Sequence, residues 1–231
     1  MYLILENAAN CGTEDLTMKK MGNTVILGDS YSTFLGSVPH GYAYWYSESI
    51  HPDHLVNSPA DTWWYQLIER TDSKLVLNCS WSGTTICHTG WGAQDCSEKS
   101  FATRLDNLID ADYFAKNEIN TLLIFGATND SWSGAPFGEE KYDNITREDM
   151  FSFRPALAHM LRRASELSGV RVIYIVNTGL KPEFTDAIVT TCRRYGCEFV
   201  LLPEVDKLDG HPTARGMTEI ADAVEQYLKN A

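Results

Sequence analysis

The stretch "VILGDSYSTF", residues 25–34, joins a short apolar run to a polar turn. Positions 25–27 are large and apolar without alternation, which is typical of a strand buried on both faces of a parallel sheet. Glycine and aspartate follow and predict a turn. The turn places Ser30 just beyond the strand, and a small hydroxyl there raises the question of which other groups of the chain meet it.

Runs of the same apolar character recur along the chain and predict five strands. They span 24–29, 74–80, 120–128, 171–178 and 198–205. Apolar residues at helical spacing occupy 62–71, 100–109, 146–169, 181–196 and 213–230. Alternating strands and helices predict an α/β fold whose parallel sheet is covered on both faces.

The longest internal helical segment, 146–169, opens with a Thr-x-x-Asp pattern and reaches Gly169. The first feature is typical of a capping box, and the second favours helix termination. Two other segments, 31–60 and 81–99, have no regular pattern and are rich in aromatic and histidine residues. Long ordered loops in an α/β domain usually carry function.

The 231 residues contain no repeat or linker, and we assign 24–231 to a single domain and 1–23 to an N-terminal extension. The formal net charge of −12 argues against nucleic acid and against anionic membrane surfaces, because both attract clustered Lys and Arg. The extension lacks the pattern of a signal peptide, and the chain lacks a membrane-length apolar run. We therefore expect a cytoplasmic protein. Domains of this size often dimerise, so a homodimer stays open.

The cysteines show neither a C-x-x-C pair nor a zinc-finger spacing to histidine, so we expect no metal. There are six, at positions 11, 79, 87, 96, 192 and 197. Buried free thiols are the favoured interpretation, and a Cys87–Cys96 bridge is the alternative.

Sites in open parallel sheets form beyond the carboxyl ends of the strands. Ser30 follows the first predicted strand, Gly83 the second and Asn129 the third, and His211 precedes the last helix. Together these residues supply a nucleophile, a backbone donor, a side-chain donor and a general base. This set predicts acyl transfer.

Physical chemistry assigns a role to each group. His211 would take the proton of Ser30, and the resulting oxyanion would be held by the N–H groups of Ser30 and Gly83 and by the Asn129 amide. Asp209 lies two residues before His211, and Asp206 five before it. Either carboxylate can accept the other ring N–H, as the acid of a triad does.

These residues resemble the SGNH (GDSL-type) hydrolase superfamily in four ordered blocks. The blocks are "GDSYS" with Ser30, "NCSWSGTT" with Gly83, "GATND" with Asn129 and "DGHPTARGM" with His211. The resemblance covers 24–230 and implies a flavodoxin-like three-layer α/β/α sandwich with strand order 2-1-3-4-5. It also implies a serine esterase that needs neither metal nor cofactor.

The chain departs from the family pattern at two places. The position three residues before His211 is Leu208 where the family has its acid, so a Ser–His dyad oriented by a backbone carbonyl stays open beside Asp209 and Asp206. The third block carries an extra residue between Gly126 and Asn129.

Family habit and the aromatic loops favour a small ester substrate, such as an O-acetyl group on a carbohydrate. Trp45, Trp81, Trp91 and Trp132 can stack on sugar faces, and we assign substrate contact to Trp81, Trp132 and Tyr31. Acyl transfer to an acceptor other than water is one alternative. A carbohydrate-binding protein that retains the fold without turnover is another. A nucleotide-binding protein is disfavoured because no phosphate-binding glycine motif follows a strand.

Overall fold

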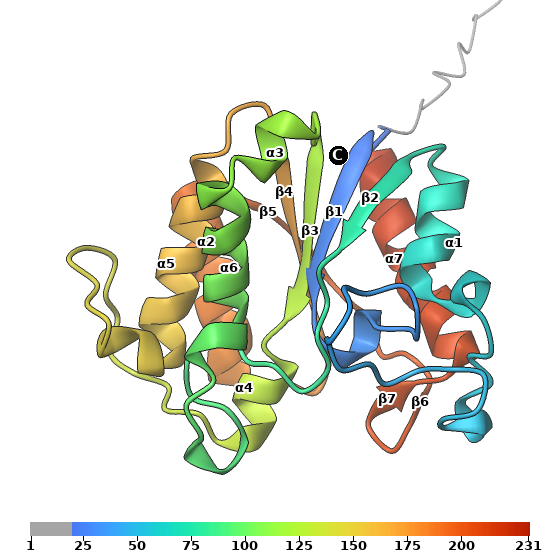
Figure 1. Ribbon diagram of the computed structural model, residues 1–231, viewed down its shortest axis with the longest axis horizontal. Helices are drawn as coiled ribbons and strands as arrows, with labels where there is room; N and C mark the ends of the chain where they lie inside the picture. The colour runs from blue at the N-terminus through green and yellow to red at the C-terminus, as the bar shows by residue number, and fades with distance from the viewer. Residues whose placement is uncertain (1–19) are drawn as a thin grey trace, which may run out of the picture.

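A computed structural model of the chain describes residues 20–231 (Figure 1). The central sheet has five parallel strands in the order β2-β1-β3-β4-β5, which confirms the predicted fold class and strand order. The strands are β1 (Asn23–Gly28), β2 (Lys74–Asn78), β3 (Thr121–Gly126), β4 (Arg171–Val176) and β5 (Glu198–Leu201). Because β1 lies between β2 and β3, the turn that carries Ser30 follows an interior strand and has the ends of two neighbouring strands beside it.

Helices form the two outer layers. They are α1 (Trp63–Arg70), α2 (Phe101–Asp110), α3 (Tyr113–Lys116), α4 (Thr128–Ser133), α5 (Phe153–Ser165), α6 (Pro182–Tyr195) and α7 (Ala214–Asn230). Figure 1 shows α1 and α7 together on one face of the sheet, and α2, α5 and α6 on the other. Each helix therefore buries one stripe against a sheet that is apolar on both faces.

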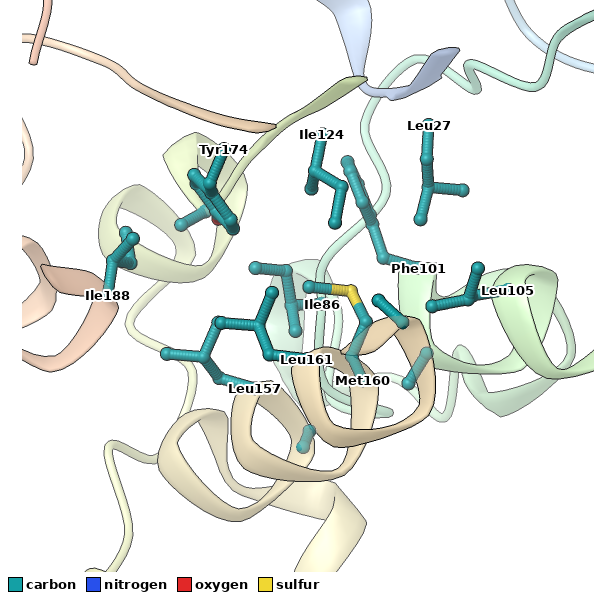
Figure 2. Close-up of a cluster of buried hydrophobic side chains, with 14 of the residues drawn as sticks. Leu27, Ile86, Phe101, Leu105, Ile124, Leu157, Met160, Leu161, Tyr174 and Ile188 are labelled. Atoms are coloured by element: carbon teal, nitrogen blue, oxygen red, sulfur yellow. The ribbon is translucent and has the colours of Figure 1, made fainter. Parts of the chain in front are cut away.

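The two faces of the sheet have separate cores, which explains the apolar runs without alternation. Leu27 of β1 packs among residues of α2 and α5, whereas its neighbour Ile26 packs among residues of α1 and α7. Figure 2 shows the first cluster, in which Phe101 and Leu105 of α2 face Leu27 across the helix–sheet interface. Every position of β1 from Thr24 to Gly28 is buried, so apolar alternation is not needed.

The prediction of one helix over 146–169 is wrong at both ends. Thr146 and Asp149 do exchange the reciprocal hydrogen bonds of a capping box, but they start a short 3₁₀ turn, Asp149–Phe151. Ser152 is extended, and α5 begins only at Phe153. Pro155 explains this, because its ring would clash with the carbonyl four residues earlier if the helix began further upstream.

The structure also contains elements that the pattern did not predict. A two-stranded antiparallel hairpin, β6 (Lys207–Leu208) and β7 (His211–Pro212), precedes α7. The third strand ends at Gly126 and not at residue 128, and Thr128 in the third block begins α4. The extra residue of this block is accommodated by Ala127, which takes a left-handed conformation with φ 76°.

The fifth strand is shorter than predicted, because a proline interrupts its main-chain N–H donors. The fifth strand ends at Leu201 and not at residue 205. The Leu202 N–H still donates to the Val176 carbonyl at 3.1 Å, but Pro203 has no N–H to continue the ladder.

The domain begins before the predicted boundary at residue 24. Met21 is fully buried in the core on the α1/α7 side, and its N–H donates to Ser73 Oγ at 3.1 Å. Residues 1–19 of the predicted extension, 1–23, lie outside the described residues. Among residues 20–231, no helix is both long and apolar enough to cross a membrane.

Each cysteine in the described part of the chain is free and buried. Cys87 and Cys96 are among them, so the alternative of a bridge between these two thiols is wrong. Cys11 lies outside the described residues.

We expect Met21→Ala to lower the free energy of unfolding by about 2–5 kcal/mol, because it leaves a cavity in a packed core. Lys20→Ala is the matched control, since the Lys20–Asp72 ion pair is exposed and should be nearly neutral for stability. Chemical denaturation of both variants measures the difference. Equal stability of the two variants would contradict a domain that includes Met21.

Candidate active site

The turn after β1 places Ser30 at the start of a short 3₁₀ turn, Ser30–Ser32. The Asp29 carboxylate caps this turn by accepting the Tyr31 N–H at 3.1 Å. Gly28 is required just before it, because a Cβ there would lie 2.5 Å from Ser80 Oγ. The close approach lets the chain turn tightly at the edge of the sheet and present the Ser30 hydroxyl beyond it.

His211 meets Ser30 at this edge. Its Nε2 lies 2.9 Å from Ser30 Oγ, a hydrogen bond between residues 181 positions apart. Both side chains are buried, with residue exposures of 5 % for Ser30 and 9 % for His211. The distance suits proton transfer from a hydroxyl to an imidazole.

Two tyrosines hold the hairpin that carries His211. The Tyr31 hydroxyl donates to the carbonyl of Gly210, and the Tyr46 hydroxyl donates to the carbonyl of Pro212 at 2.8 Å. The anchors lie on either side of His211 in the chain. They fix its backbone relative to the segment that carries Ser30.

A backbone carbonyl occupies the place beside His211 where a triad has its acid. Nδ1 of His211 lies 3.3 Å from the Asp209 main-chain oxygen. Within residues 20–231, neither the Asp209 nor the Asp206 carboxylate is hydrogen-bonded to the ring. Asp209 is exposed, and Asp206 accepts the hydroxyl of Thr213, the N-cap of α7. The arrangement is a Ser–His dyad whose imidazole donates to a carbonyl.

Burial lowers the pKa of His211 to about 4. The Asp209 carbonyl raises this pKa, whereas the neighbouring His54, His51 and Lys207 lower it. Since the folded pKa lies below the ordinary value of 6.5, His211 is neutral at pH 7 and its Nε2 lone pair can accept a proton. The low pKa also means that the protonated ring is costly to form.

The second block contributes Gly83 from the loop after β2. The Trp81 N–H donates to the Gly28 carbonyl at 3.1 Å, which ties this loop to the Ser30 turn. Gly83 has φ 77°, which favours glycine, and a Cβ there would meet only open space. Its N–H and that of Ser30 have no hydrogen-bond partner within residues 20–231. Both are therefore free to donate to an oxyanion.

Asn129 of α4 is held by the loops around it. Its Nδ2 donates to the Thr84 carbonyl at 3.0 Å and lies 3.4 Å from the Asp29 carboxylate. Its Oδ1 accepts the indole N–H of Trp91 at 3.0 Å. Trp91 therefore orients the amide. The sequence predicted only that the loop of Trp91 is rich in aromatic residues, and not this contact.

Two buried aspartates brace the site. Burial raises the pKa of Asp29 to about 7 and that of Asp130 to about 6. Asp130 accepts the N–H groups of Ile86 and Cys87 at 2.8 and 3.1 Å. The bonds hold the second block against α4, the helix that carries Asn129.

A buried arginine connects the Ser30 turn to the second block. Arg104 of α2 donates to the carbonyls of Gly28 and Cys79 and to Thr84 Oγ1. Burial lowers its pKa, and the Asp29 carboxylate opposes this shift. The sequence analysis missed this contact. The signal that could have revealed it is an arginine three residues after Phe101, on the buried face of an amphipathic helix.

The residues that we assigned to substrate contact have different positions. Tyr31 is fully buried, so its assignment to substrate contact is wrong. Its hydroxyl instead holds the β6/β7 hairpin by donating to the Gly210 carbonyl. Trp132, 39 % exposed, lies edge-on to His211 with ring centroids 6.5 Å apart. Trp81 is half-buried and stacked on Tyr42 at 4.0 Å. Trp91 is 47 % exposed beside Asn129.

Trp45, proposed from sequence as a sugar platform, stacks within the protein. One face lies on His211, with centroids 3.7 Å apart and planes 7° apart. The other face lies on His51 at 3.9 Å and 10°. Trp45 therefore packs face to face against the His211 ring.

The arrangement has the groups that acyl transfer requires: a hydroxyl bonded to a neutral imidazole, and free N–H donors from two neighbouring loops. In the described part of the chain, no group of three or more His, Cys, Asp or Glu side chains is placed to hold a metal ion.

The family model GDSL-like Lipase/Acylhydrolase matches residues 22–228. A candidate GDSL-like lipase from Bacteroides ovatus ATCC 8483 is 36 % identical, with 92 % of this chain and 100 % of that chain covered and a TM-score of 0.85. A second candidate from Bacteroides uniformis ATCC 8492 is 38 % identical, with 91 % and 97 % covered and a TM-score of 0.82.

A more distant structure shares the fold. Est24, a carbohydrate acetylesterase from Sinorhizobium meliloti, is 13 % identical, with 90 % of this chain and 99 % of that chain covered and a TM-score of 0.55. No curated protein matches the chain.

We expect the ring of His211 to titrate with a midpoint near pH 4, because burial opposes its protonation. Proton NMR of the histidine ring signals over pH 3–9 measures this midpoint, and His211→Asn identifies the signal by its loss. A midpoint for that signal near 6.5 would contradict the buried, neutral base.

Proposed function

Because the chain belongs to the GDSL-like lipase/acylhydrolase family, we propose that it is a serine esterase that removes acetyl groups from a carbohydrate. The hydrogen bond of 2.9 Å between Ser30 Oγ and His211 Nε2 carries the proposal. It joins a nucleophile to a base that is neutral at working pH.

The reaction follows from the contacts of the site. Ser30 Oγ attacks the ester carbonyl carbon as its proton passes to His211 Nε2, and the carbonyl oxygen becomes an oxyanion. The free N–H groups of Ser30 and Gly83 stabilise that charge. The Asn129 amide, whose N–H groups point at the Thr84 carbonyl and the Asp29 carboxylate, would have to exchange one of these bonds to join them. The His211 imidazolium returns its proton to the leaving alkoxide, and an acyl-serine remains. Water then releases the acid by the same steps.

Three observations support a small acyl group on a sugar. Ser30 and His211 are nearly buried, so little room surrounds the reacting atoms for a long acyl chain. Trp91 and Trp132 are exposed beside Asn129 and His211, where aromatic faces can stack on a sugar ring. Est24, which shares the fold, is described as a carbohydrate acetylesterase, and this suggests the substrate class to test.

We expect Ser30→Ala to lower kcat/KM for p-nitrophenyl acetate by at least about 10³-fold, because Ser30 supplies the one hydroxyl that is hydrogen-bonded to His211 among residues 20–231. Ser37→Ala makes the same chemical change in the following loop and should leave the rate unchanged. Acetate release from acetylated xylo-oligosaccharides, set against hydrolysis of p-nitrophenyl octanoate, tests the substrate class.

The outcomes separate the proposal from its alternatives. Retained activity in Ser30→Ala would exclude Ser30 as the nucleophile. Faster cleavage of octanoate than of sugar acetate would exclude the carbohydrate assignment. Sugar binding without turnover would indicate a binding protein, and acetyl transfer to an added alcohol in preference to water would indicate a transferase.

We expect Asp209→Asn to keep kcat within about twofold of the wild type, because His211 bonds to the main-chain oxygen of this residue. Asparagine tolerates the left-handed backbone of position 209, where φ is 47°, so the carbonyl stays in place. Steady-state kinetics measure the effect. A loss of 10³-fold or more would mean that the carboxylate acts as the acid of a triad.

A further inference from the structure

We propose that Trp45 is a positioning residue for His211 and that its indole face stabilises the imidazolium that His211 becomes during the reaction. The inference rests on the proposed function, since it concerns the general base of that reaction. In a triad a carboxylate orients the imidazole and stabilises the imidazolium, and here an aromatic ring would contribute to both.

The geometry distinguishes Trp45 from the other rings around His211. Its plane lies 7° from that of the imidazole, with centroids 3.7 Å apart. Tyr31 is tilted by 55° at 5.3 Å, and Trp132 is nearly perpendicular at 6.5 Å. Only Trp45 among these three rings presents its electron-rich face squarely to the imidazole, the arrangement in which a cation is attracted to a ring.

Trp45 is fixed from the nucleophile side of the site. The main-chain N–H of Trp45 donates to Thr33 Oγ1 at 2.8 Å, and this hydroxyl donates to the Ser30 carbonyl at 3.0 Å. Its outer face is covered by His51. The turn that holds Ser30 therefore also holds the ring that packs on the base.

The indole N–H does not explain why a tryptophan stands here. Trp45 Nε1 is buried and has no hydrogen-bond partner within residues 20–231. A buried donor without a partner destabilises a fold, so hydrogen bonding gives no advantage over an apolar side chain. The ring face is the part of Trp45 that contacts the site.

The charges around His211 leave the imidazolium in need of such a partner. The groups that act on its charge are the main-chain oxygen of Asp209 and the side chains of His54, His51 and Lys207. Burial, and after it the neighbouring His54, His51 and Lys207, disfavour its protonation. The Asp29 carboxylate bonds to Tyr31 N–H, and Asp130 to the second block. None of these carboxylates is hydrogen-bonded to the His211 ring.

The test varies the charge of the ring face without varying its shape. Tryptophan carrying one, two or three ring fluorines is introduced at position 45 alone, since fluorine withdraws electron density from the face. We expect kcat/KM for p-nitrophenyl acetate at pH 7.5 to fall with each fluorine, by about tenfold over the series. Thermal unfolding of each variant should be unchanged.

Trp64 of α1 is the matched control. It is buried, and its Nε1 also lacks a partner among the described residues, but it packs in the core on the α1/α7 side. The same substitutions there should leave kcat/KM unchanged. A flat response at Trp45, or an equal fall at Trp64, would overturn the proposal. Failure of the proposed function is distinct, because activity of the unmodified protein would then survive Ser30→Ala.

Discussion

The hydrogen bond between Ser30 and His211 depends on the order of strands in the sheet. It joins residues 181 positions apart, and it forms because β1 is an interior strand, between β2 and β3, while the chain returns to the carboxyl edge of the sheet through the β6/β7 hairpin. Parallel strands end together, so the loops that follow them meet there. Any change in strand order or register would separate the two groups.

Buried polar groups hold that edge together. Arg104 binds the Ser30 turn and the second block from below, and Asp130 binds the second block to α4. Such groups are costly to bury, as the raised pKa values of Asp29 and Asp130 indicate. Satisfied by hydrogen bonds, they specify one arrangement of the loops, and a site that must align donors to within tenths of an ångström needs such an arrangement.

The histidine of the dyad is oriented without a carboxylate. A main-chain carbonyl defines which ring nitrogen carries the proton, and two tyrosines hold the hairpin on either side. This keeps the imidazole neutral and aimed at Ser30, but it supplies no negative charge for the protonated ring. The aromatic surroundings of His211, with Trp45 stacked on it, are the feature of the site that addresses that charge.

The sequence by itself determined which segments form strands and how the layers stack, because apolar periodicity and turn chemistry are local properties. Gly28, Ser30 and His211 could be placed at one edge of the sheet on that basis. The four blocks followed from the resemblance to SGNH hydrolases. The tertiary structure alone decided that the carbonyl of Asp209 meets His211, that Tyr31 lies buried and that Trp45 stacks on the base. These contacts join distant segments, and a residue's type does not specify which main-chain atom or ring face will reach another. The start of α5 differs for a related reason: the capping signal at Thr146 was real, but the geometry of Pro155 overruled it.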